Sequence, residues 1–314
     1  MATGTQDYVG DPRNDAVLIS VNGALVPRDQ AKVSVFDSGF VLGDGVWEGL
    51  RLVEGRLAFL DAHLDRLFEG AQMLMIDIGL TRAELTRRLH QCLEANAMTD
   101  GVHLRLMVTR GPKRSPYQDP RLSLGTATIV IIPEWKQPRP EMYAWGISLF
   151  TVHVRRTGPA DQDPRLNSHS KLNDILACIQ AMQAGADEAL MLDDRGFVAT
   201  CNSTHFFIVR GGELWTSGGG FCLRGITRGN VLRVGREAGL TVRECDFSLF
   251  DVYGADEAFV TGTFAGLTPV TTVDGRQLPL LGSADDASGP VTRLLRQRYQ
   301  DLIMSEGGHS GGRP

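Results

Sequence analysis

The sequence predicts an α+β protein of two domains, with mixed and antiparallel sheets and flanking helices. The chain has 314 residues, which is about the length of two ordinary domains. Strand-like segments come in runs with helical segments scattered between them, an order that favours α+β over a strictly wound parallel sheet. Hydrophobic residues make up 42% of the chain and charged residues 22%, a composition typical of globular domains with substantial cores.

A segment without periodicity separates the two predicted domains. Residues 134–142 read EWKQPRPEM, with two prolines and mixed charge, so we expect an interdomain linker over 134–141. A smaller N-terminal domain is expected over 16–133 and a larger C-terminal domain over 142–304. The two polar ends of the chain, residues 1–15 and 305–314, are predicted to be flexible tails.

The first domain is predicted to open with a hairpin and a helix. Residues 16–27 read AVLISVNGALVP, in which Asn22-Gly23 is the strongest short-range signal for a two-residue turn. Apolar residues at helical spacing then predict a helix over residues 60–74, with Asp61 placed to cap it.

A second helix and two strands complete the first domain. The four residues from Thr81 read T-R-A-E, a capping box in which the first and last side chains bind each other's backbone N–H groups. The apolar segments at 103–111 and 126–133 predict strands.

The second domain is predicted to mix strands and helices. Helices are expected from Lys171, from Thr227 and over 289–304, and strands within 146–156, 186–217, 240–244 and 257–263. The helix after Lys171 carries an apolar stripe that we expect to face the core, formed by Leu172, Ile175, Leu176, Ile179 and Met182.

Composition excludes several classes of partner. A net charge of −5 and a pI near 5.8 leave no electrostatic footprint for nucleic acid. No window approaches the roughly 18 to 20 apolar residues that cross a bilayer, and the polar N-terminus does not read as a secretory signal. We therefore expect a cytoplasmic protein that binds neither nucleic acid nor membrane.

The cysteines and the hydrolase motifs narrow the chemistry further. The five cysteines are widely spread and include no C-x-x-C pair, so we expect thiols rather than disulfides or a zinc site, and no bound metal. Ser-His-Asp, H-E-x-x-H and P-loop patterns are absent, which removes the usual support for serine hydrolases, zincins and P-loop NTPases.

Lys171 is the lysine that the sequence singles out. The chain holds only three others, namely Lys32, Lys113 and Lys136, and the last two lie in Pro-flanked polar loops. Lys171 begins an amphipathic helix, so its amine either reaches solvent along its stem or is desolvated. Desolvation lowers the pKa of an amine, as a Schiff-base lysine requires.

Two segments of the second half have the composition of anion cradles. In GITRGNV (225–231), Gly225, Ile226 and Thr227 stand directly before a helix, where backbone N–H groups and the helix dipole suit a phosphate. A plain Thr N-cap is the alternative. In TGTFAG (261–266), Thr263 can donate a hydrogen bond beside small residues at a strand end.

Cationic side chains in the first half leave their roles open. Arg66 lies on the predicted helix 60–74, as a phosphate ligand or an exposed charge. His103 and Arg105 share one face of a strand, with Leu104 and Leu106 on the other. Arg105 is suited to holding a carboxylate, and a solvated strand face is the alternative.

Taken together, these segments resemble the class IV, or fold type IV, pyridoxal-phosphate aminotransferases, the family of branched-chain and D-amino-acid transaminases. The resemblance covers nearly all of residues 17–300. Six segments carry it, in the family's order and spacing: VSVFDSGFVLGDGVWEGLRL (33–52), HLDRL (63–67), KLNDILACIQAMQAGADEALMLD (171–193), GFVATCNSTHFFIV (196–209), LRGITRGNV (223–231) and ADEAFVTGTFAGLTPV (255–270).

The resemblance implies a site as well as a fold. It implies a homodimer of two-domain chains, with pyridoxal 5′-phosphate (PLP) at the domain interface. The positions matching the family's phosphate contacts are Arg66, Ile226, Thr227 and Thr263. Those matching its substrate contacts are Trp47, His103, Arg105 and the loop amides of Phe264 and Ala265.

The implied activity is ping-pong transamination between an amino acid, most naturally branched-chain or otherwise apolar, and a 2-oxo acid by Schiff-base chemistry through a lysine. Alternatives on the same fold are a D-amino-acid transaminase, an (R)-amine transaminase and a 4-amino-4-deoxychorismate lyase. A degenerate PLP-binding protein without turnover is a further alternative.

Two positions depart from the family pattern. The family reads K-S-x-N-Y-L at its lysine, whereas this chain reads NSHSKLNDIL. Asn167 falls in the lysine column and Lys171 in the tyrosine column, one helical turn later, and we still assign the catalytic amine to Lys171. The family's Glu, which keeps the pyridine nitrogen protonated, is replaced by Thr200, whose hydroxyl can hydrogen-bond that nitrogen but cannot hold a proton there by charge.

Overall fold

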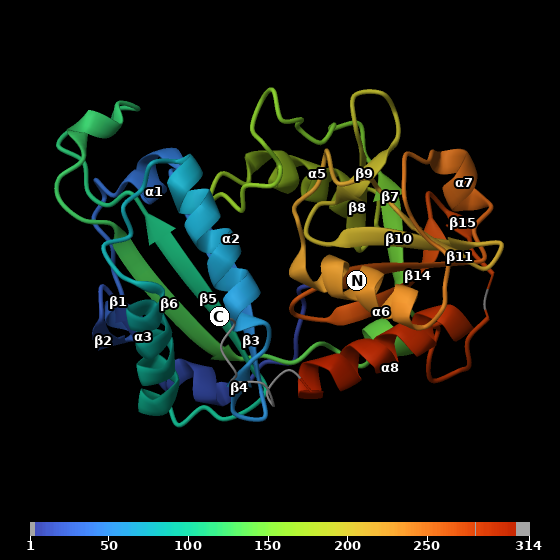
Figure 1. Ribbon diagram of the computed structural model, residues 1–314, viewed down its shortest axis with the longest axis horizontal. Coiled ribbons are helices and arrows are strands. Elements are labelled where there is room, and N and C mark those ends of the chain that lie inside the picture. The colour runs from blue at the N-terminus through green and yellow to red at the C-terminus, as the bar shows by residue number, and fades with distance from the viewer. Residues whose placement is uncertain (1–3, 280, 306–314) are drawn as a thin grey trace. The chain divides into compact units, whose positions relative to one another are not determined.

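The computed structural model describes residues 4–279 and 281–305, and within them the chain forms two compact units (Figure 1). We call Gly10–Gln137 with Leu166–Lys171 the small unit. The large unit consists of residues 4–9, Pro138–Arg165 and Leu172–Ser305. Both units combine a sheet with helices, which confirms the predicted α+β class with mixed and antiparallel sheets.

The small unit is built on a six-stranded sheet in the order β2-β1-β6-β5-β3-β4. All five of its strand pairs are antiparallel. The strands are β1 (Leu18–Val21), β2 (Ala24–Pro27), β3 (Gly45–Val53), β4 (Arg56–Leu57), β5 (Val102–Thr109) and β6 (Thr128–Trp135).

The predicted hairpin is the β1–β2 pair, in which Val21 lies opposite Ala24. Its two turn residues, Asn22 and Gly23, have φ angles of 54° and 90°. Two consecutive positive φ angles define the turn that matches the twist of the strands, and Asn-Gly adopts them at little cost.

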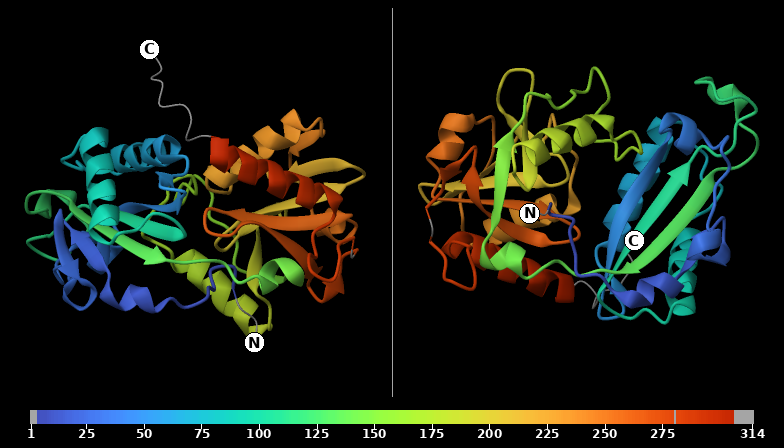
Figure 2. Two further views of the ribbon diagram at one scale, coloured as in Figure 1. Left: turned by 90° about the horizontal axis from the view of Figure 1, so that it is seen from below. Right: turned by 180° about the vertical axis from the view of Figure 1, so that it is seen from behind.

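Helices α2 (Leu60–Met73) and α3 (Arg82–Ala95) cover one face of this sheet (Figures 1 and 2). The capping box at Thr81 and Glu84 is present, as predicted. The prediction that Asp61 caps α2 is wrong. The N-cap is Phe59, which makes no side-chain cap bond, and Asp61 lies in the first helical turn. The shorter helices are η1 (Pro12–Ala16), η2 (Arg28–Gln30), α1 (Ser38–Leu42) and η3 (Pro120–Leu122).

The large unit is built on a nine-stranded mixed sheet. Its order is β12-β11-β10-β13-β14-β7-β8-β9, with β15 paired to β14. Three pairs are parallel: β11 with β12, β14 with β7, and β7 with β8. The strands are β7 (Ile147–Thr151), β8 (Glu188–Leu192), β9 (Val198–Cys201), β10 (His205–Arg210), β11 (Glu213–Thr216), β12 (Val242–Glu244), β13 (Glu257–Gly262), β14 (Gly266–Val273) and β15 (Arg276–Gln277).

Five helices accompany this sheet in the described part of the chain: α4 (Glu141–Ala144), α5 (Leu172–Gln183), α6 (Ile226–Glu237), α7 (Leu249–Tyr253) and α8 (Pro290–Ser305). The main core of the unit lies between the sheet and residues from Phe247 to Ala255. None of the helices within residues 4–279 and 281–305 has the length and apolar composition needed to cross a bilayer.

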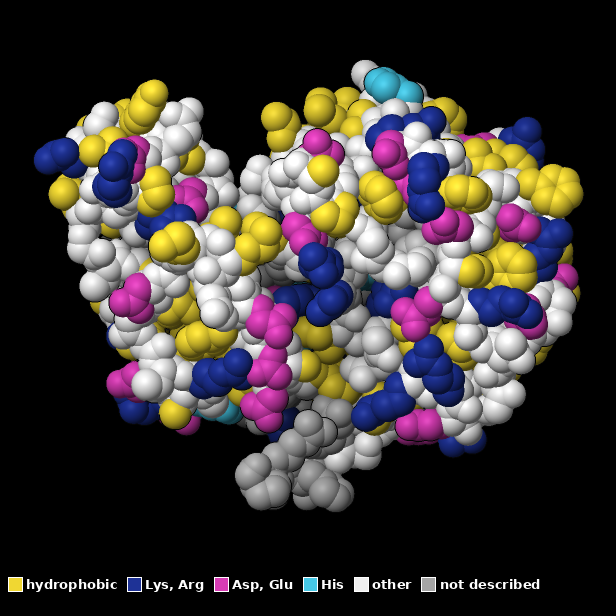
Figure 3. All heavy atoms as spheres, turned by 45° about the horizontal axis from the view of Figure 1, so that its top comes forward, with side chains coloured by type: hydrophobic (Ala, Val, Ile, Leu, Met, Phe, Trp, Pro, Cys, Tyr) yellow, Lys and Arg dark blue, Asp and Glu magenta, His cyan; other side chains and the backbone are white. Residues whose placement is uncertain are grey.

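The prediction for the apolar stripe of α5 is wrong. Its five large side chains are 41–66% exposed, and α5 instead buries Ala177 and Ala181. Small residues on the inward face let the helix lie close to β8 and to the segment after β7. Figure 3, which turns the top of Figure 1 forward, shows hydrophobic side chains exposed among charged ones on this face.

The segments expected at the edges of the domains are partly packed. Within the predicted tail 1–15, Thr5 is buried and shares a hydrogen bond with Ser203, and Asn14 bonds the backbone of Trp135. The units divide between Gln137 and Pro138, while residues 134 and 135 of the expected linker belong to β6. Of the expected tail 305–314, Ser305 ends α8 and the rest lies outside the described residues.

Candidate active site

The face of the small-unit sheet opposite its helices carries the predicted substrate residues. Leu104 and Leu106 point into the core, and the alternation of β5 therefore sends His103 and Arg105 to the other face, as predicted. Arg105 lies opposite Gly49 in the register with β3. Its guanidinium carbon stands 4.2 Å from the ring centroid of Trp47, which is a cation–π contact.

His103 fills the space above Gly49. A Cβ atom built on Gly49 would lie 3.1 Å from the Nε2 of His103, so a side chain there would crowd the imidazole. Burial first, and then the nearby charges of Lys136, Arg105 and Arg51, lower the pKa of His103 to about 3. The ring is therefore neutral at physiological pH and offers one donor and one acceptor.

Residues 166–171 form a strap along β3 that belongs to the small unit. The backbone N–H of Trp47 donates to Asn167 at 3.0 Å, and that of His169 donates to Gly45 at 3.0 Å. Ser168 forms an isolated bridge with Val46, and the indole N–H of Trp47 donates to the Ser168 carbonyl at 3.2 Å. These bonds fix the backbone immediately before Lys171.

Lys171 is the last residue of this strap. The prediction that it begins the helix is wrong, because α5 starts at Leu172 and residues 167–171 are not helical. The amine nevertheless returns to the side chain four residues earlier. Its Nζ lies 3.4 Å from the Oδ1 of Asn167 and 5.5 Å from the ring centroid of Trp47.

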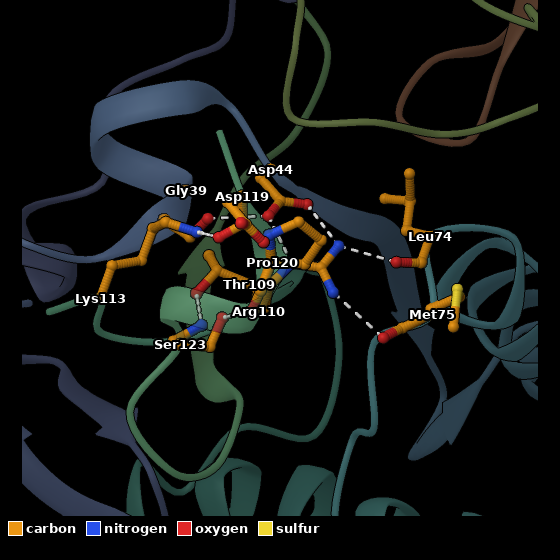
Figure 4. Close-up of polar contacts among 12 residues, drawn as sticks. Gly39, Asp44, Leu74, Met75, Thr109, Arg110, Lys113, Asp119, Pro120 and Ser123 are labelled. Carbon is orange, nitrogen blue, oxygen red and sulfur yellow. Dashed lines mark hydrogen bonds and ion pairs between the residues drawn. The ribbon is translucent and has the colours of Figure 1, made fainter. Parts of the chain in front are cut away.

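Lys113 differs from the solvated loop lysine that the sequence suggests. Its side chain is 2% exposed, and its Nζ donates to the carbonyl of Asp119 at 2.9 Å (Figure 4). Beside it, Arg110 pairs with Asp44 and donates to the carbonyls of Leu74 and Met75. The amine of Lys113 is therefore engaged within a packed polar cluster.

Arg66 is held by a carboxylate that the sequence reasoning did not identify. Its Nε donates to the Oε1 of Glu48 at 2.7 Å and its Nη2 donates to Oε2 at 2.6 Å. The Glu48 side chain is completely buried, and the Nδ1 of buried His63 bonds the same Oε2 at 2.6 Å. His63 and Arg66 are three residues apart on α2, a spacing that places both on one helix face.

The ionisation of this cluster follows from burial and hydrogen bonding. Burial alone would raise the pKa of Glu48, but the bonds from His63 and Arg66 hold it below its usual value. Burial lowers the pKa of His63. Glu48 is therefore ionised, His63 is a neutral donor, and the Arg66 guanidinium is fixed in a bidentate pair.

In the large unit, the predicted phosphate cradle is the first turn of α6. Gly225 is the N-cap and makes no side-chain cap bond, so the alternative of a Thr227 N-cap is wrong. Ile226 and Thr227 are the first two helical residues, and the Thr227 hydroxyl bonds the Tyr299 hydroxyl at 3.3 Å. A Cβ at position 225 would lie 2.2 Å from the His205 ring, which explains a glycine here.

The second predicted cradle is the turn between β13 and β14. Thr263, Phe264 and Ala265 join Gly262 to Gly266, which lie opposite each other in the antiparallel register. The carbonyl of Ala265 accepts a bond from the Tyr143 hydroxyl at 2.7 Å. The turn is thus tied to α4, and Phe264 and Ala265 are buried with Met142.

Thr200 lies on β9 and is buried. Its hydroxyl donates to the carbonyl of Thr204 at 2.8 Å, and the backbone N–H of Cys201 donates to the same carbonyl at 3.0 Å. The Thr200 oxygen keeps its lone pairs, and no charge is associated with it.

The sequence of this chain matches that of a family of known enzymes. Residues 45–273 match the family model described as class IV amino-transferase. The chain belongs to the class IV aminotransferases. This confirms the resemblance carried by the six sequence segments.

Individual class IV relatives agree with this membership. The chain is 38% identical over 296 residues to the branched-chain-amino-acid aminotransferase-like protein 2 of Arabidopsis thaliana, covering 94% of the chain. It is 33% identical over 293 residues to the D-alanine aminotransferase of Listeria monocytogenes, covering 91% of the chain and 96% of that protein. The solved branched-chain amino acid aminotransferase of Thermobaculum terrenum, in its PLP form, superposes with a TM-score of 0.80 at 25% identity, covering 92% of this chain and 94% of that one.

The chain is shorter than some of its class IV relatives. It spans 52% of the length of the two Arabidopsis thaliana proteins that it matches.

The structure groups the predicted residues unit by unit. In the small unit it brings Trp47, Arg105 and Lys171 together and places His103 beside them, above Gly49. Arg66 is separate, on the helix-covered side with Glu48. In the large unit, Ile226 and Thr227 share one helix turn, Thr263, Phe264 and Ala265 share another turn, and Thr200 lies on β9.

Proposed function

We propose that the chain is a PLP-dependent aminotransferase that moves an amino group from an amino acid, branched-chain or otherwise apolar, to a 2-oxo acid. The observation that carries this proposal is the placement of the Lys171 amine against Trp47 and Asn167 on a hydrogen-bonded strap. A lysine held in this way is available as a nucleophile and as a proton carrier. When bound, PLP supplies the electron sink that lets the α-proton of an amino acid leave.

The residues present fit the phosphate of that cofactor. The first turn of α6 begins at Gly225 without a side-chain cap. The backbone N–H groups of Ile226 and Thr227 therefore face outward at the N-terminus of the helix, which attracts anions. We assign the phosphate to these two residues, to Thr263 and to Arg66. Glu48 occupies two N–H groups of Arg66 and thereby orients the remaining donors of the guanidinium.

The proposal gives Thr200 a weaker role than the family's glutamate has. Its hydroxyl is engaged with the Thr204 carbonyl, and a neutral oxygen cannot hold a proton on the pyridine nitrogen by charge. Lys171 must then do more of the proton transfer itself. Its amine takes the α-proton from the amino acid, and in the second half of the reaction it gives a proton to the α-carbon that comes from the 2-oxo acid.

For the substrate, we assign the carboxylate to the face of the small-unit sheet opposite its helices and to the turn amides of Phe264 and Ala265. Arg105 supplies a fixed positive charge over Trp47, and neutral His103 supplies a hydrogen-bonding group without repelling a cation. The backbone N–H groups of Phe264 and Ala265 are the remaining donors in this assignment. Trp47 contributes an apolar ring against which an apolar substrate side chain can pack.

The activity test is a panel of amino donors with 2-oxoglutarate as acceptor, measured as glutamate formed. We expect L-leucine, L-isoleucine and L-valine to react and Lys171→Ala to lose at least a thousandfold in rate, while the exposed-lysine control Lys32→Ala keeps wild-type rates. Glutamate production by Lys171→Ala at the wild-type rate contradicts the lysine assignment.

A D-amino-acid transaminase is the second candidate, favoured by the 33% identity to the Listeria monocytogenes D-alanine aminotransferase. The same panel with D-alanine, and with (R)-amines, separates the two candidates by enantiomer. Pyruvate release from 4-amino-4-deoxychorismate identifies the lyase instead. If the protein binds PLP and converts none of these substrates, the result supports the last alternative, a degenerate PLP-binding protein without turnover.

The shifted lysine register allows a sharper test. The double variant Asn167→Lys with Lys171→Tyr restores the family's residues in both columns. Because Nζ of Lys171 already stands beside Asn167, we expect the double variant to recover activity that Lys171→Ala lacks. A double variant as inactive as Lys171→Ala, although folded and PLP-bound, contradicts the view that the two positions serve one site.

We propose a homodimer as the working form. The exposed stripe of α5 and the exposed side chains of Val35, Phe36 and Phe40 in the small unit are apolar surfaces of the kind that proteins bury in assemblies. Light scattering after gel filtration tests this. The wild type should have twice the chain mass, and Ile175→Glu and Phe40→Glu should shift it toward the monomer, whereas a wild-type monomer at micromolar concentration contradicts the proposal.

We also propose a cytoplasmic location. All five cysteines are thiols in the structure, which suits a reducing compartment, in which disulfides rarely form. Cell fractionation with an antibody against the chain tests the location, and recovery in a secreted or membrane fraction contradicts it.

A further inference from the structure

Asn167 holds its side-chain amide in a fixed orientation beside Lys171. The residue is 5% exposed, and its Nδ2 donates to the carbonyl of Trp47 at 2.6 Å. Turning the amide over would break this buried hydrogen bond, which is costly. The oxygen is therefore the atom that faces the amine, 3.4 Å from Lys171 Nζ.

The indole of Trp47 supplies a second contact to the same amine. Nζ lies 5.5 Å from the ring centroid, within cation–π range. The ring is itself held, because its N–H donates to the Ser168 carbonyl at 3.2 Å. Asn167 and Trp47 are also bonded to each other through their backbones, so the two contacts come from one connected platform.

Charged and titratable groups of both signs surround this platform. Arg105 lies over the same indole at 4.2 Å. Burial first lowers the pKa of His169, Asp37 raises it, and Arg105 and Lys171 lower it, so the net shift is downward and the ring is neutral. Glu134 is a second carboxylate in these surroundings and acts on Arg105. Within the platform itself, the amide oxygen of Asn167 and the indole face of Trp47 both favour a positive charge on Lys171.

We propose that Asn167, with the face of Trp47, is a positioning residue. It holds the Lys171 amine beside position 167, where the family pattern has its lysine. The inference rests on the proposed function, in which Lys171 is the reacting amine. It explains how a lysine displaced by four positions along a non-helical strap serves the same site. It also gives the asparagine in that column a task that neither alanine nor a residue without an acceptor can perform.

The test measures how reactive Lys171 is in the full chain without added cofactor. A limiting amount of acetic anhydride modifies each lysine in proportion to its accessible neutral amine, and peptide mass spectrometry gives the yield at each site. Lys32, which is exposed, serves as the internal reference.

Removing either contact should make the amine more reactive. Asn167→Ala takes away the oxygen that favours the charged amine, so we expect Lys171 acetylation relative to Lys32 to rise about three- to tenfold. Trp47→Phe keeps the backbone bonds of the strap, loses the indole bond to the Ser168 carbonyl and weakens the cation–π contact, so we expect a rise of about twofold. The matched control is Asn173→Ala, which removes an amide bonded to the Arg155 carbonyl and should leave the ratio unchanged.

An unchanged ratio in both Asn167→Ala and Trp47→Phe overturns the inference, as does an equal rise in Asn173→Ala. A second readout uses the PLP-loaded protein. At limiting PLP, borohydride should fix about threefold less cofactor to Lys171 in Asn167→Ala than in the wild type, because the amine, although more often neutral, is no longer held in position.

The two proposals fail in different ways. If borohydride fixes the cofactor of the wild type to another lysine, the proposed function loses its catalytic residue. If it fixes the cofactor to Lys171 while the acetylation ratios and the labelled fraction stay unchanged in the variants, only the positioning role of Asn167 is contradicted.

Discussion

Helices α2 and α5 carry similar amphipathic patterns and use them in opposite ways. In α2, the apolar side chains at Leu64 and Leu67 are buried in the core of the small unit. In α5, the large apolar side chains are 41–66% exposed, and the buried positions are Ala177 and Ala181. Two helices with similar periodicity therefore differ in what their large apolar residues face, which is the core in α2 and the surface in α5.

The comparison teaches that periodicity identifies a helix but not the partner of its apolar face. Within one chain, α5 packs through alanines, because small side chains allow close approach to the sheet. Its large residues then remain for a partner of another kind, and the proposed homodimer supplies one. The following predictions test this contrast from the largest effect to the smallest.

Truncating the buried stripe of α2 should cost the most. Leu67 is 1% exposed, so Leu67→Ala should lower the free energy of unfolding by about 2 to 5 kcal/mol through lost burial and a cavity. Urea unfolding of wild type and variant measures the difference. A loss below about 1 kcal/mol would mean that α2 does not depend on this face.

Enlarging the inward face of α5 should cost the next largest amount. Ala181 is 1% exposed and packs with Ala177 and Met191, so Ala181→Leu should destabilise the chain by about 1 to 3 kcal/mol through overpacking. The same urea titration measures it. A neutral or stabilising result would show that the alanine face has room, and that the comparison with α2 is wrong.

Two buried titratable groups, one in each unit, should respond in opposite directions to acid. The folded pKa of His103 is about 3, and its usual value in an unfolded chain is near 6.5. At a pH between these two values, the unfolded chain binds a proton on His103 and the folded small unit does not. Stability from this residue falls as the pH drops from 6.5 toward 3, by about 2 kcal/mol between pH 7 and pH 5.

Glu188 of the large unit has the opposite sign. Burial raises its pKa, so its contribution is present below the unfolded value and is lost as the pH rises through the folded one. Urea unfolding at pH 7 and pH 5, with proteolytic fragments assigning each transition to a unit, should show His103→Gln flattening the small-unit response. An unchanged pH response in that variant would mean that His103 is protonated in the folded chain.

The smallest effect on stability should come from the outer face of α5. Ile179 is 41% exposed, so Ile179→Ala should change the free energy of unfolding of the dilute protomer by no more than about 0.5 kcal/mol. The same substitution should weaken self-association, which sedimentation equilibrium measures. A large loss of stability together with unchanged association would reverse the comparison.

Local signals in the sequence were sufficient for much of the fold. The Asn22-Gly23 turn and the capping box at Thr81 depend on residues within four positions of each other, and both are present. The alternation along β5 also placed His103 and Arg105 on one face. These features follow from backbone chemistry and strand periodicity, which need no knowledge of distant residues.

The features that sequence reasoning missed depend on distant partners. Lys113 is buried because its amine meets the Asp119 carbonyl, and Lys171 leaves the helix because residues 166–171 bond to β3, about 120 residues earlier in the sequence. Glu48 holds Arg66 through tertiary packing of β3 against α2. A signal existed for this cluster, because His63 and Arg66 share a helix face, but nothing local identified the carboxylate between them.

The central claim is that Lys171 provides the amine of this class IV aminotransferase. The most direct measurement is borohydride reduction of the PLP-loaded protein, followed by peptide mapping of the fixed cofactor across the four lysines. We predict that the label is on the peptide that contains Lys171. Label on Lys32, Lys113 or Lys136, or a colourless protein that cannot be loaded with PLP, would contradict the account.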